Sequence, residues 1–201
     1  MIRLFRSALA TLSIFATSWT YAAEGDLGIV LLHGKWDRAP TNVLALSRQL
    51  EDAGYKVAAP LMPWSDTRGY DATYTQALEE IEAAAKSLRT KGATRIVIAG
   101  LSLGANGAIA YAASGRQVDG IAALSPGHTP ERGNFRKALE TSVAKARGMV
   151  ESGNGADKAM FEDRNQGQSR TVRTSAQAYL SYFDPEGMGN MQMSASMIPS
   201  A

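Results

Sequence analysis

Residues 100–104, Gly-Leu-Ser-Leu-Gly, have the residue types and spacing that point most directly to chemistry. The apolar run 95–99 before them predicts a buried strand, and the alanine-rich run 105–111 after them predicts a helix. A serine between a strand and a helix in the pattern G-x-S-x-G is typical of a nucleophile elbow, a sharp turn that exposes the hydroxyl. The positions two before and two after the serine must be small. We therefore predict Ser102 as a catalytic nucleophile, with Gly100 and Gly104 as the glycines of the elbow.

A second apolar run, residues 28–32, predicts a buried strand whose following loop would complete the site. Attack of a serine on an acyl carbonyl develops an oxyanion, which needs two backbone N–H donors. We expect one donor from Leu103, directly after the nucleophile. The other is expected from the loop after residues 28–32, most simply from Lys35, with Trp36 as the alternative. Gly34 would let this loop turn back towards the serine.

The remaining apolar runs predict the elements that hold these loops in place. Strands are expected at residues 28–32, 56–59, 95–99 and 120–124, and helices at 42–53, 74–89, 105–111, 134–151 and 176–183. Strands that alternate with helices indicate a parallel sheet with right-handed crossovers. After His128 the pattern loosens, and the glycine- and serine-rich stretch 151–156 is expected to be a loop.

With these motifs in order, the sequence resembles the α/β-hydrolase family from about residue 27 to residue 130. The resemblance is carried by residues 28–34, 50–60 and 100–105, and residues 165–187 resemble a group of small exported bacterial members. It implies an α/β fold with a parallel-sheet core in three layers, αβα. It also implies a Ser–acid–His triad, with the acid and the histidine on later strand-end loops, and hydrolysis of a small-molecule ester or related acyl substrate.

The resemblance leaves the catalytic base open, because the chain has only two histidines. The base of this family follows the serine, so His33 is expected to shape its loop. The strands that would carry the acid and the later histidine are not evident in the sequence. We therefore expect a domain that lacks its C-terminal strands and is truncated before both groups. Such a domain would have little activity. Alternatively, His128 has become the base, with Glu131 as a weak candidate for the acid, or the domain is a non-catalytic ligand-binding module. Asp184, before a proline, is expected to cap a turn.

Composition narrows the function further. A chain of 201 residues with 45% hydrophobic residues is long enough for one domain with a substantial core. The absence of cysteine excludes a disulfide framework, a thiol nucleophile, a lipoprotein anchor and a cysteine-ligated metal. With two histidines we expect no metal site, and the resemblance implies no cofactor.

The N-terminal 23 residues have the layout of a secretory signal peptide: a basic start, an apolar middle and small residues at 22–23. We therefore expect export to the periplasm or the medium, with residues 24–201 as the partial hydrolase domain. An uncleaved anchor helix is the alternative, although the segment is short for a stable membrane anchor. Arg3 and Arg6 account for the net charge of +2, so the remaining chain is near neutral and nucleic acid is not an expected partner.

Overall fold

The computed structural model describes residues 26–38 and 41–198, and its centre is a four-stranded sheet. The strands are β1 (Leu27–Leu32), β2 (Lys56–Ala58), β3 (Arg95–Leu101) and β4 (Gly120–Leu124), in the order β2-β1-β3-β4. All three pairings are parallel, as predicted. Leu32 lies opposite Gly100, and Leu101 lies opposite Leu124. The loops that follow β1, β3 and β4 therefore emerge at one edge of the sheet.

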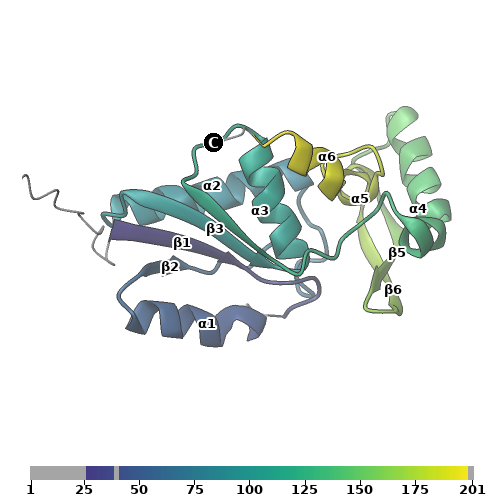
Figure 1. The fold of residues 1–201 in the computed structure, drawn as a ribbon. Helices are drawn as coiled ribbons and strands as arrows, with labels where there is room; N and C mark the ends of the chain where they lie inside the picture. The colour runs from purple at the N-terminus through teal and green to yellow at the C-terminus, as the bar shows by residue number, and fades with distance from the viewer. Residues whose placement is uncertain (1–25, 39–40, 199–201) are drawn as a thin grey trace, which may run out of the picture.

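Helices cover both faces of this sheet, which gives the expected three layers (Figure 1). On one side lies α1 (Thr41–Asp52), and on the other lie α2 (Tyr74–Thr90) and α3 (Leu103–Ala113). On α2 an apolar stripe at helical spacing is buried throughout: Tyr74, Leu78, Ile81, Ala85 and Leu88. The apolar residues of α1 are buried only in part. Val43 packs against the sheet, but Leu44 and Leu46 are 38% and 37% exposed, because α1 turns a narrower face towards the sheet than its leucines suggest.

The chain after β4 forms a further group of helices and strands, most of which lies beyond the carboxyl ends of the sheet strands (Figure 1). It consists of α4 (Gly133–Glu151), β5 (Lys158–Asn165), β6 (Gln168–Ser175), α5 (Ala176–Phe183) and α6 (Met191–Ser196). Two of these helices, α4 and α5, match the predicted ranges to within a residue. The antiparallel β5–β6 hairpin was not predicted. Its side chains alternate between buried and exposed positions, and Phe161, Asp163, Val172 and Thr174 point inwards.

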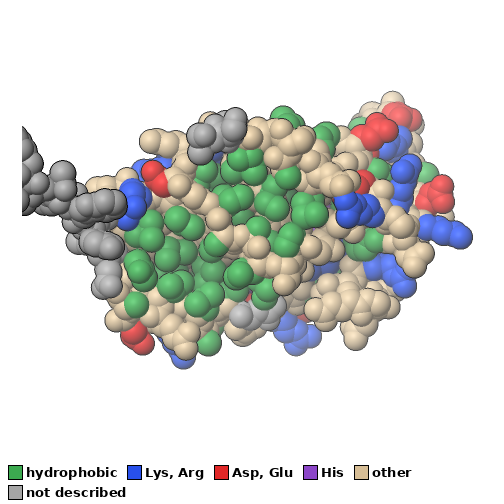
Figure 2. All heavy atoms as spheres, in the orientation of Figure 1, with side chains coloured by type: hydrophobic (Ala, Val, Ile, Leu, Met, Phe, Trp, Pro, Cys, Tyr) green, Lys and Arg blue, Asp and Glu red, His purple; other side chains and the backbone are tan. Residues whose placement is uncertain are grey.

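Hydrophobic side chains gather in the middle of the molecular face shown in Figure 2. β4 is one of the two edge strands of the sheet in the described part of the chain, and its last three residues, Ala122–Leu124, are exposed. Leu124 alone is 45% exposed. Hydrophobic side chains therefore meet solvent along this side of the sheet.

The N-terminal prediction falls outside this description. Residues 1–23, expected to be the signal peptide, are not among the described residues, so export stays a prediction. Within residues 26–38 and 41–198, the structure contains no helix with the length and apolar character needed to cross a bilayer.

Candidate active site

Ser102 occupies a strained turn between β3 and α3. Its backbone has φ 55° and ψ −119°, values that a residue with a side chain rarely adopts. The Ser102 N–H donates to the Leu124 carbonyl at 2.9 Å, which ties the turn to β4. A Cβ at Gly100 would lie 2.2 Å from the Gly104 carbonyl oxygen, and one at Gly104 would lie 2.5 Å from the Leu32 carbonyl oxygen. Both neighbours are backbone atoms, so this geometry requires glycine on either side of the serine.

A cavity of about 710 Å³ lies against this turn, at the carboxyl edge of the sheet. Four of the predicted site residues line it: Ser102, Leu103, Lys35 and His128. The rest of the wall comes from Gly127, Asn134, Phe135, Lys137, Ala138, Arg164, Asn165, Gln166 and Gly167. His33, Gly34 and Trp36 are not among the lining residues. The cavity therefore joins the β3–α3 turn, the loop after β1 and the β5–β6 hairpin.

The loop after β1 is held by hydrogen bonds that use up both nitrogens of His33. The Met62 N–H donates to His33 Nε2 at 2.9 Å, so Nδ1 carries the proton and donates to the Gly34 carbonyl at 2.7 Å. Burial lowers the pKa of His33 below its ordinary value, which keeps the ring neutral. Trp36, at φ 64°, donates its backbone N–H to the Trp64 carbonyl at 3.0 Å. Among the described residues, the Lys35 N–H has no such partner.

Asp163 on β5 is a residue that the sequence interpretation missed, and it gathers three side chains beside the cavity. Its fully buried carboxylate accepts hydrogen bonds from Lys35 Nζ at 2.7 Å, Trp36 Nε1 at 2.6 Å and the Tyr70 hydroxyl at 2.7 Å. Burial lowers the pKa of Lys35 and raises that of Tyr70, and the Asp163 charge opposes the first shift while adding to the second. Asp163 thus joins the loop after β1 to the hairpin.

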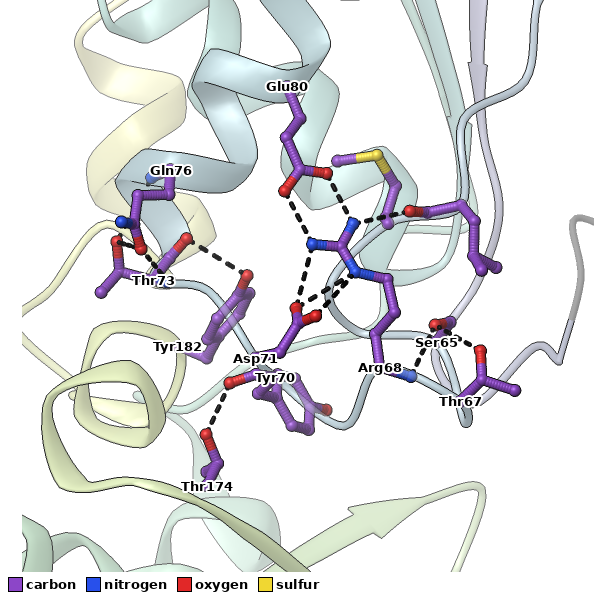
Figure 3. A network of polar contacts seen from close by, with 12 residues as sticks. Ser65, Thr67, Arg68, Tyr70, Asp71, Thr73, Gln76, Glu80, Thr174 and Tyr182 are labelled. Atoms are coloured by element: carbon purple, nitrogen blue, oxygen red, sulfur yellow. Dashed lines mark hydrogen bonds and ion pairs between the residues drawn. The ribbon is translucent and has the colours of Figure 1, made fainter. Parts of the chain in front are cut away.

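Tyr70 is itself placed by a network in the loop between β2 and α2 (Figure 3). The Arg68 guanidinium donates to both carboxylate oxygens of Glu80, at 2.6 and 2.8 Å, and also binds Asp71 and the Leu61 carbonyl. From the hairpin, the Thr174 hydroxyl donates to the Tyr70 carbonyl (Figure 3). This loop is therefore fixed on α2 at one end and on β6 at the other.

His128, the possible base, lies in the cavity wall with one nitrogen committed. Its Nε2–H donates to the Tyr182 carbonyl at 2.7 Å, which leaves Nδ1 buried without a partner in the described structure. Burial, with a contribution from the Lys35 charge, lowers the pKa of His128 to about 3. The Asn106 amide binds both the backbone carbonyl and the N–H of His128, at 2.7 and 3.2 Å. His128 is therefore neutral and firmly held.

Asp184, the expected turn cap, and Glu131, the candidate acid, are not among the residues that line the cavity. Asp184 accepts the Glu186 N–H at 3.0 Å and pairs with Arg147 at 2.9 Å, an arrangement that suits the expected turn cap. Glu131 has carboxylate oxygens that are buried without a hydrogen bond, with the Arg132 guanidinium 3.8 Å away. No group of three or more metal-ligating side chains occurs within the described ranges.

Comparisons with known proteins agree with this architecture. The family model described as "Alpha/beta hydrolase family" matches residues 29–193. A monoacylglycerol lipase from Paleococcus ferrophilus has a similar structure, with a TM-score of 0.57, 22% identity and coverage of 86% of this chain and 70% of that one. A structure described with LipS and LipT, two metagenome-derived lipolytic enzymes, gives a TM-score of 0.56, 17% identity and coverage of 87% and 69%. At these identities the two structures show likeness of fold. No curated protein sequence matches the chain. Since the family model spans most of the sequence, the chain belongs to the alpha/beta hydrolase family.

Proposed function

We propose that this protein is an exported serine hydrolase that cleaves carboxylic esters through Ser102. The observation that carries the proposal is the backbone of Ser102, at φ 55° and ψ −119° in a strand-to-helix turn, beside a cavity of about 710 Å³. Strain of this kind persists where the surroundings enforce it, and it is common at nucleophiles. The Ser102 side chain also makes no helix-capping hydrogen bond, so its hydroxyl stays available.

In this mechanism, the Ser102 hydroxyl oxygen attacks the acyl carbonyl as its proton passes to a base. The negative charge that develops on the carbonyl oxygen is stabilised by the N–H groups of Leu103 and Lys35. The hydrogen bond from the Trp36 N–H to the Trp64 carbonyl favours Lys35 over Trp36 as the second donor. The alkoxide leaving group takes up a proton, and water then hydrolyses the acyl-serine by the same steps in reverse.

Neither histidine of the chain has the surroundings of an efficient base. His33 has both ring nitrogens in hydrogen bonds, and His128 is held neutral with no carboxylate on its ring. An imidazole of such low pKa is a weak proton acceptor at neutral pH. The chain is therefore expected to turn over slowly, because Ser102 attacks without efficient removal of its proton.

The test is hydrolysis of 4-nitrophenyl hexanoate by four proteins: the chain itself, Ser102→Ala, His128→Ala and Ser87→Ala. Ser87 is exposed on α2 and serves as a matched serine control. Ser102→Ala should remove the activity, whereas Ser87→Ala and His128→Ala should retain it. Equal rates for Ser102→Ala and the unchanged chain would show that Ser102 is not the nucleophile and would favour a ligand-binding module. Loss of a fast reaction in His128→Ala would instead make His128 the base.

Export is a second part of the proposal, supported by the layout of residues 1–23. Mass spectrometry of the protein recovered from its native host should find a mature N-terminus near Ala23 or Glu24. Recovery of the intact chain alone, from the cytoplasm, would contradict export.

A further inference from the structure

The turn of the β5–β6 hairpin forms part of the cavity wall that also holds Ser102. Gln166 and Gly167, the two residues between the strands, have φ values of 49° and 81°. Two successive positive φ angles make a tight hairpin turn whose twist matches that of the strands. Arg164 and Asn165, at the end of β5, are presented to the cavity directly before this turn.

This hairpin turn is fixed to the loop beside the nucleophile. Lys35 Nζ donates to the Arg164 carbonyl at 3.0 Å, in addition to its bond with Asp163. In return, the Asn165 side-chain amide donates to the Lys35 carbonyl at 3.4 Å. A ligand bound at Ser102 therefore meets a wall whose backbone is already in place.

The charged residues that line the cavity are all positive. Its lining residues include Lys35, Lys137 and Arg164 but no aspartate or glutamate. The Lys35 charge is balanced by Asp163 at 2.7 Å. Within the described chain, the Arg164 guanidinium and the Lys137 ammonium have no hydrogen bond or ion pair, so two positive charges beside the cavity are left for a ligand.

We propose that Arg164 and Lys137 form an anion-binding subsite, and that the substrate is an ester which also carries a carboxylate or phosphate group. This inference rests on the proposed ester hydrolysis at Ser102. A guanidinium can bind either group through two parallel N–H donors, and Lys137 supplies a second positive charge. Asn165 and Gln166 add neutral polar groups to the same wall. The subsite selects an anionic ester over a neutral ester of equal length.

The first experiment compares 4-nitrophenyl hemiadipate with 4-nitrophenyl hexanoate, which differ by a carboxylate in place of a methyl group. The unchanged chain should show a kcat/KM about tenfold higher for the hemiadipate, the factor expected for one charge-assisted hydrogen bond. Arg164→Gln and Lys137→Gln should each reduce that ratio, and added salt should reduce it further in Lys137→Gln. Arg173→Gln removes an exposed charge from β6, outside the cavity lining, and should leave the ratio unchanged. Equal rates for the two esters, or equal effects of the three variants, would overturn the subsite.

The second experiment measures binding without catalysis, so that failure of the chemistry and failure of the subsite are told apart. Monomethyl adipate and methyl hexanoate are titrated into Ser102→Ala by calorimetry, and the anion should bind about tenfold more tightly, an advantage that Arg164→Gln removes. Adipate and inorganic phosphate are then added as competitors, and the stronger one identifies which anion the subsite accepts. If the unchanged chain shows no hydrolysis that depends on Ser102, but the anion still binds more tightly than the neutral ester, only the proposed function is wrong. Equal binding of the two methyl esters, or competition by neither anion, would sink the subsite.

Discussion

Lys35 Nζ lies 2.7 Å from a carboxylate oxygen of Asp163, and both side chains are buried. Removal of one member of a buried pair leaves a desolvated charge, at a cost of about 3–5 kcal/mol. Asp163→Asn should therefore lower the free energy of unfolding by about that amount, measured by urea denaturation. Asp157→Asn, which changes an exposed carboxylate just before the same hairpin, is the matched control and should cost less than about 0.5 kcal/mol.

The double variant Lys35→Met/Asp163→Asn separates the charge from the other contacts of Asp163. Because the uncompensated ammonium is gone, this variant should be more stable than Asp163→Asn alone, with a coupling free energy of about 0.5–3 kcal/mol. Additive effects of the two substitutions would mean that the pair contributes through packing, and not through its charge.

Replacement of glycine by alanine should have opposite effects in the elbow and in α4. Gly100→Ala places a Cβ 2.2 Å from the Gly104 carbonyl oxygen and should destabilise the protein by about 3 kcal/mol or more, because only backbone can move. Gly148→Ala, in the last turn of α4 with open space around the new methyl group, should stabilise it by up to about 0.5–1 kcal/mol. Thermal unfolding followed by circular dichroism measures both, and a neutral Gly100→Ala would contradict the turn geometry.

The two buried histidines predict that stability falls on acidification. In the unfolded chain the His128 imidazole binds a proton below about pH 6.5, whereas burial lowers its folded pKa to about 3. The folded state therefore binds fewer protons than the unfolded state between these values, so stability is full above pH 6.5 and is lost as the pH falls towards 3. The lowered pKa of His33 acts in the same direction.

Chemical denaturation at a series of pH values tests this linkage. His128→Gln can still donate an N–H towards the Tyr182 carbonyl but cannot titrate, so the slope of unfolding free energy against pH between 6.5 and 3 should become shallower. His33→Gln should reduce the slope independently. A His128→Gln protein with the same slope as the unchanged chain would show that His128 is protonated in the folded state.

The exposed apolar side of the sheet predicts self-association on warming. Leu124, 45% exposed on the edge strand β4, lies in a stretch with free backbone edges and apolar side chains, a combination that favours pairing between chains. Leu124→Lys should raise the temperature at which light scattering begins. Val150→Lys, at a residue 37% exposed on α4, is the control and should leave that temperature nearly unchanged.

The central strands of the sheet and the turn at Ser102 were predictable from sequence, because β1, β3 and β4 each contain an apolar run and the G-x-S-x-G motif lies between a predicted strand and a predicted helix. The β5–β6 hairpin was not, since its inward positions combine Phe161 and Val172 with Asp163 and Thr174. A buried aspartate breaks the apolar alternation that marks a strand. The one local signal of the hairpin was Gln166-Gly167, a pair that contains glycine and has the length of a tight turn.

The same limit applies to the cavity. Lys35 was predicted for its backbone N–H, but the position of its side chain depends on Asp163, which is 128 residues away. Nothing in the neighbourhood of residue 35 identifies that partner. His128 was predicted as a possible base because it follows Ser102 in the chain. Its neutral state depends on burial and on the hydrogen bond to the Tyr182 carbonyl, and only the folded structure shows both.

The distance along the chain between Lys35 and Asp163 has a consequence for synthesis. A nascent chain that ends between residues 124 and 158 has all four strands of the parallel sheet but neither strand of the hairpin. It therefore has no partner at Asp163 for the Lys35 ammonium, which stays in water, and the hairpin wall of the cavity is missing. Contacts between such distant residues form late, after the loop between them has closed. Assembly of this cavity therefore follows docking of the hairpin, and a partly synthesised chain whose sheet has already folded still lacks one wall of it.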